Sequence, residues 1–162
     1  MYMKKVFLAL AVLCGIGMLC ACDNKDYSEL IIGTWDVQTY SFLHVDYYQD
    51  TSWIRDDEIY NVSDTNYIGF DAAEFFADGI MRWHTNENYQ AFHGNESITL
   101  SWSINEAKLY IERGSDSLGY VGWEYEIKEL NDRNLVIERH DRVIQDFNNY
   151  EYTESYALKR RK

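Results

Sequence analysis

The chain has 162 residues, of which 27 are acidic and 15 are basic, so its formal net charge at pH 7 is −12. Nucleic acid binding needs a basic face that contacts the phosphates, and this charge balance argues against a nucleic acid partner. The length suits one domain, and neither proline nor a repeat of fixed period marks an internal boundary.

The first residues have the pattern of a signal peptide. Lys4 and Lys5 precede a mostly apolar run over residues 6–19, which is too short to cross a hydrocarbon core of about 30 Å as a helix. This pattern predicts a signal peptide over residues 1–21. The run ends in Leu-Cys-Ala-Cys, with Cys22 last, which resembles the lipobox of bacterial lipoproteins.

The lipobox resemblance implies that Cys22 is the lipid attachment site. Its thiol would carry diacylglycerol, with palmitate among the acyl chains, and the chain would be cut just before it. Two acyl chains hold a protein on a membrane without a spanning helix. Residues 22–29 would form a polar leash, and we expect a location in the bacterial cell envelope, at the outer membrane, with the face left open. The alternative is a secretory signal followed by a chance cysteine.

Beyond the leash, the sequence predicts one short helix and then a series of strands. Asp26 and Glu29 resemble a capping box ahead of Leu30 and Ile31. Apolar and polar residues alternate from Ile98 onward and again in later segments, with turn residues between them. Eight strands are predicted, near residues 30–42, 67–77, 80–86, 97–105, 108–113, 120–129, 134–140 and 146–159.

Eight antiparallel strands in sequence order predict an all-β fold over residues 30–162. Such strands can remove their edges by closing into an up-and-down barrel, whose interior is filled by side chains or holds one small ligand. A flatter sandwich is the alternative. The long segment 43–66 separates the first two predicted strands.

Gly33-Thr34-Trp35 at the start of the first strand resembles the Gly-x-Trp of lipocalins. Further pieces in the same order are similar to bacterial lipocalin-like lipoproteins: FFADG, LSWSI, KLYI, YEIKELNDRNLVIE and YALKR. The resemblance implies that Gly33 lets the chain pass tightly from helix to strand. It also implies that Trp35 seals one end of the barrel beneath a stacked basic side chain. We assign that side chain to Arg139, with Lys159 and Arg160 as alternatives.

Segment 43–66 combines aromatic rings with carboxylates, which suits a sugar-binding lip, a lid over the barrel or an ordinary packed excursion. The resemblance implies a carrier that holds a small apolar or amphipathic ligand at the barrel mouth. The alternative is a filled scaffold whose acidic, aromatic segment binds a glycan or a protein partner. The candidate ligand-binding residues are Trp53, Tyr60, Tyr67, Trp102, Trp123 and Tyr125.

Catalysis and metal binding find little support in the sequence. No serine lies in a Gly-x-Ser-x-Gly elbow, and no phosphate-cradling glycine loop is present. The four histidines lack zinc-ligand spacing, and the adjacent carboxylates from Asp56 to Glu58 lack the alternation of a calcium loop. We therefore expect a non-enzymatic monomer with neither cofactor nor metal.

Overall fold

The computed structural model describes residues 26–48, 51–61, 63, 69–116, 119–145 and 148–162. They form two short helices, α2 (Tyr27–Ile31) and α3 (Glu87–His93), and nine strands. The strands are β1 (Gly33–Tyr48), β2 (Thr51–Asn61), β3 (Phe70–Phe75), β4 (Ile80–Thr85), β5 (Ser97–Asn105), β6 (Lys108–Asp116), β7 (Gly119–Leu130), β8 (Asn134–Gln145) and β9 (Asn148–Arg160).

Eight of the strands close into an antiparallel barrel, as predicted. From β3 to β9 each strand pairs with the next one in sequence. The first four residues of β1 pair with β3, and nearly the whole length of β1 pairs with β9, which closes the ring. Asp26 caps α2, because its carboxylate accepts a hydrogen bond from the Ser28 N–H at 3.0 Å. This short helix begins inside the predicted leash.

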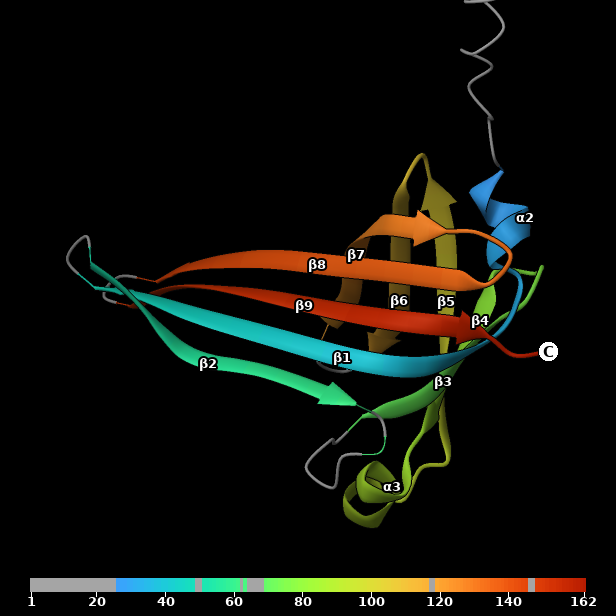
Figure 1. The fold of residues 1–162 in the computed structure, drawn as a ribbon, viewed down its shortest axis with the longest axis horizontal. Helices are drawn as coiled ribbons and strands as arrows, with labels where there is room; N and C mark the ends of the chain where they lie inside the picture. The colour runs from blue at the N-terminus through green and yellow to red at the C-terminus, as the bar shows by residue number, and fades with distance from the viewer. Residues whose placement is uncertain (1–25, 49–50, 62, 64–68, 117–118, 146–147) are drawn as a thin grey trace, which may run out of the picture.

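The remaining strand, β2, belongs to an arm that the sequence did not predict. β2 pairs with β1 from Thr39 to Tyr48, beyond the part of β1 that pairs with β3. Strands β8 and β9 also continue past the barrel, so that β2, β1, β9 and β8 project together as a four-stranded sheet (Figure 1). Much of segment 43–66 is therefore a β-hairpin.

A second helix also differs from the prediction of a single helix. α3 lies between β4 and β5, at the opposite side of the barrel from α2 (Figure 1). Its N-cap is Asn86, whose side chain accepts a hydrogen bond from the Tyr89 N–H at 2.8 Å, and its C-cap is Gly94 in the left-handed conformation. Neither described helix has the length and apolar character needed to cross a membrane.

The barrel interior is filled at the end next to α2. The largest fully buried side chains come from α2 and from most of the barrel strands: Trp35, Phe75, Ile31, Met81, Leu109, Ile111, Leu135 and Ile137. Burying one such side chain contributes about 1.5–3 kcal/mol relative to leaving it exposed. This packing fixes a closed end, and the cavity lined by barrel side chains lies toward the other end.

Candidate ligand cavity at the open end of the barrel

The closed end is built around Trp35, which is completely buried. Its indole Nε1–H donates a hydrogen bond to the Ile31 carbonyl at 2.7 Å, and the Arg160 guanidinium lies 4.3 Å from the ring centroid. Arg160 also donates to the Ile32 carbonyl at 2.8 Å and to the Leu30 carbonyl. Trp35 and Arg160 thus satisfy carbonyl groups that the end of α2 would leave without partners.

The stacked cation is therefore Arg160, and the assignment of Arg139 was wrong. Trp35 and Arg160 are opposite each other in the β1–β9 ladder, which brings the guanidinium over the indole. Arg139 instead lies with its Cζ 5.0 Å from the Tyr152 ring centroid and hydrogen-bonds the Tyr152 hydroxyl. Lys159, the other alternative, is exposed.

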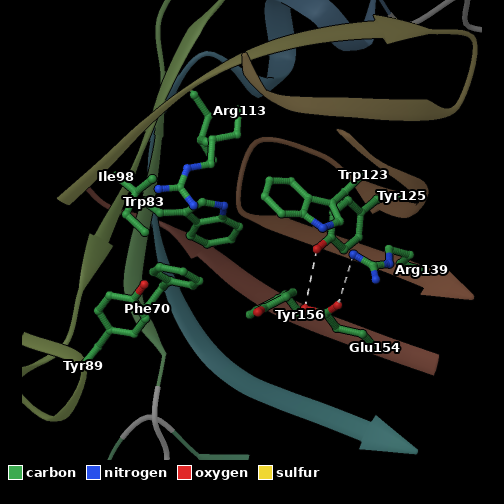
Figure 2. A pocket seen from close by; sticks show the side chains of 11 residues that line it. Phe70, Trp83, Tyr89, Ile98, Arg113, Trp123, Tyr125, Arg139, Glu154 and Tyr156 are labelled. Atoms are coloured by element: carbon green, nitrogen blue, oxygen red, sulfur yellow. Dashed lines mark hydrogen bonds and ion pairs between the residues drawn. The ribbon is translucent and has the colours of Figure 1, made fainter. Parts of the chain in front are cut away.

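A cavity of about 250 Å³ occupies the opposite, open end of the barrel. Strands β3 to β9 and helix α3 all contribute side chains to it (Figure 2). The lining residues are Phe70, Trp83, Tyr89, Ile98, Leu100, Arg113, Trp123, Tyr125, Arg139, Glu154 and Tyr156. A concave, mostly apolar space with a few polar groups is the usual form of a small-molecule site.

Aromatic rings in contact form one wall of this cavity. Phe70 stacks on Trp83 with ring centroids 4.9 Å apart, and Tyr89 of α3 packs 5.6 Å from Phe70. Trp83 is in turn 5.3 Å from Tyr156, which lies 6.4 Å from Tyr125. Because the rings support one another, the wall is a preformed apolar surface.

Charged side chains lie beside this wall. Arg139 Nη1 is 3.8 Å from Glu154 Oε2, and the same guanidinium pairs with Asp141. The Tyr125 hydroxyl donates a hydrogen bond to Glu154 Oε1 at 3.5 Å (Figure 2). Burial raises the pKa of the Glu154 carboxyl, although hydrogen bonding from Tyr156 and the Arg139 charge act in the opposite direction. Burial likewise raises the pKa of Tyr125, so its hydroxyl remains a donor at neutral pH.

The structure places only some of the predicted ligand-binding residues at the cavity. Trp123 and Tyr125 line the cavity. Trp102 does not: its Nε1–H donates to the Phe76 and Ile80 carbonyls, and its ring packs on Phe75 in the filled part of the barrel. Trp53 and Tyr60 lie in β2, and Tyr67 is outside the described residues.

Several residues that line the cavity were not predicted from the sequence, although the sequence position of Glu154 could have indicated one of them. Glu154 interrupts a run of apolar residues on one face of the last strand, and it is this carboxylate that points into the cavity. Among the described residues, no cluster of three histidine, cysteine or carboxylate side chains could hold a metal ion. No protein-family model matches this chain, and no curated protein matches it either.

Proposed function

We propose that this chain is a lipid-anchored, non-enzymatic carrier of the bacterial envelope, similar to lipocalin-like lipoproteins. It would hold a small apolar or amphipathic molecule at the open end of the barrel. The observation that carries the proposal is the cavity of about 250 Å³ with its aromatic wall. This volume is just below that of drug-sized pockets, so the ligand is small or keeps part of itself outside.

Filling the cavity tests this proposal. Binding would be measured on a shortened protein, the binding form, which lacks residues 1–21 and carries Cys22→Ser. All described strands and helices lie in residues 26–162 and are therefore kept. We expect Ile98→Trp to weaken binding of decanoate at least about tenfold, because the new ring occupies the space of the ligand. Tryptophan fluorescence would follow the titration, since Trp83 and Trp123 line the cavity.

Thr99→Trp is the matched control, because Thr99 is the next residue of β5 and is exposed on the outer face. It should bind decanoate as the parent protein does. Equal affinities of the parent and Ile98→Trp, with both folded by circular dichroism, would rule out the cavity as the binding site.

The lipid anchor has its own test in the full chain. Cys22→Ser removes the thiol that would be alkylated, so we expect the variant to remain uncleaved or to be released from membranes. Membrane fractionation and labelling with a radioactive fatty acid would measure this change. Unaltered acyl labelling of the variant would contradict the assignment of Cys22.

The projecting arm favours a second candidate, in which the protein binds a glycan. Along one face of the arm, His44 lies 5.2 Å from Tyr150 and Phe42 lies 6.0 Å from Tyr152, measured between ring centroids. Asp46 lies beside His44, with its Oδ1 3.2 Å from His44 Nε2. Aromatic rings beside carboxylates can stack on sugar rings and accept hydrogen bonds from their hydroxyl groups.

A further inference from the structure

Three charged side chains follow buried apolar residues on the inward faces of their strands, all at the open end of the barrel. In β6, Leu109 and Ile111 are buried and Arg113 follows on the same face. Arg139 continues the buried face of β8 in the same manner, and Glu154 does so in β9. All three line the cavity. Charged side chains that line a mostly apolar cavity are candidates for contacts with a ligand.

The two arginines at the cavity, Arg113 and Arg139, differ in their ion-pair partners. Arg139 is compensated within the protein, because Glu154 and Asp141 both lie beside its guanidinium. Arg113 forms no ion pair with any side chain that the structure describes, and it is exposed at the rim of the cavity. Figure 2 shows the Arg113 side chain reaching into the cavity. Its guanidinium is therefore placed where it can meet a group of the ligand at the boundary with water.

The charges around Arg113 favour an anionic ligand group at this position. The whole chain carries a formal charge of −12, so Arg113 is a cation on a predominantly acidic protein. Within the cavity the charge of Arg139 is compensated by Glu154 and Asp141, whereas Arg113 has no such neighbour among the described side chains. A ligand cation would instead be repelled by Arg113, since the charge of Arg139 is already compensated. An anion at Arg113 would gain a charge-assisted hydrogen bond that a neutral group cannot match.

We propose that the ligand is an anionic amphiphile whose acidic head group pairs with Arg113 at the rim, while its apolar body lies against the aromatic wall formed by Phe70, Trp83 and Tyr156. This inference rests on the proposed carrier function and adds the chemical class of the ligand. The small volume agrees with a head group that stays outside the cavity.

Three probes with the same ten-carbon chain test the head group: decanoate, decan-1-ol and decylammonium. We expect the binding form of the protein to prefer decanoate by about tenfold over decan-1-ol at pH 7.5, and to bind decylammonium most weakly. Arg113→Gln should remove most of the preference for decanoate, by weakening decanoate binding far more than binding of decan-1-ol. Raising the salt concentration from about 50 to about 500 mM should weaken decanoate binding alone.

Arg82→Gln is the matched control, because Arg82 is also exposed but lies on the outer face of β4, 5.2 Å from the Phe76 ring centroid. It removes the same charge and should leave the preference intact. If all three probes bind equally, or if Arg113→Gln weakens decan-1-ol as much as decanoate, the anionic class is wrong and the carrier function stands. If no probe binds, the carrier function itself fails and the inference fails with it.

Discussion

Replacing Trp35 with alanine is expected to lower the free energy of unfolding by about 3–5 kcal/mol. Trp35 is completely buried, so the substitution removes a large apolar side chain and leaves a void beneath α2. It also removes the hydrogen bond to the Ile31 carbonyl and the surface on which Arg160 stacks. Urea unfolding followed by circular dichroism would measure the loss.

Trp123→Ala provides the comparison for this prediction. Trp123 is only partly buried and lies at the cavity. Its removal should therefore cost clearly less than the removal of Trp35. Equal losses for the two variants would contradict the assignment of Trp35 as the side chain that seals the closed end.

The second large effect is expected for Gly33→Ala, with a loss of about 2–4 kcal/mol. Gly33 has a φ of +128°, a conformation that residues with a Cβ rarely adopt. A Cβ there would also lie 2.9 Å from Arg160 Nη1 and would displace the guanidinium from its carbonyl partner. Thermal or urea unfolding would measure the combined cost.

Gly94→Ala provides a milder comparison for this prediction. Gly94 has a φ of +71°, and a Cβ at this position would meet nothing within 4 Å. Its substitution should cost only about 1–2 kcal/mol, the price of the left-handed conformation. If Gly33→Ala were no more harmful than Gly94→Ala, the contact between Gly33 and Arg160 would not matter for stability.

The barrel could be predicted because its strands have one buried and one solvated face. In β5, Leu100 is buried while Thr99 and Ser103 are exposed, which is the alternation visible in the sequence. The arm could not be predicted in this way. All residues of β1 from Ser41 to Tyr47 are half-buried whichever face they occupy, so neither face is consistently apolar.

The site could be predicted only in part, because alternation gives the face of a residue and not its height in the barrel. Ile98 and Trp102 share one face of β5, yet at about 3.3 Å per residue they are about 13 Å apart along the strand. Ile98 consequently lines the cavity, while Trp102 packs on Phe75. The partner of Trp35 depended on the register between β1 and β9, which no local pattern specifies.

The most direct test of the carrier function is to map the bound ligand by backbone amide NMR during a titration with decanoate. The carrier function predicts saturable shifts for Phe70, Trp83 and Tyr156 in the barrel, with Gly33 and Trp35 at the closed end unchanged. Shifts confined to the arm, around Phe42 and Tyr150, or no saturable shifts at all, would contradict a ligand-binding cavity at the open end.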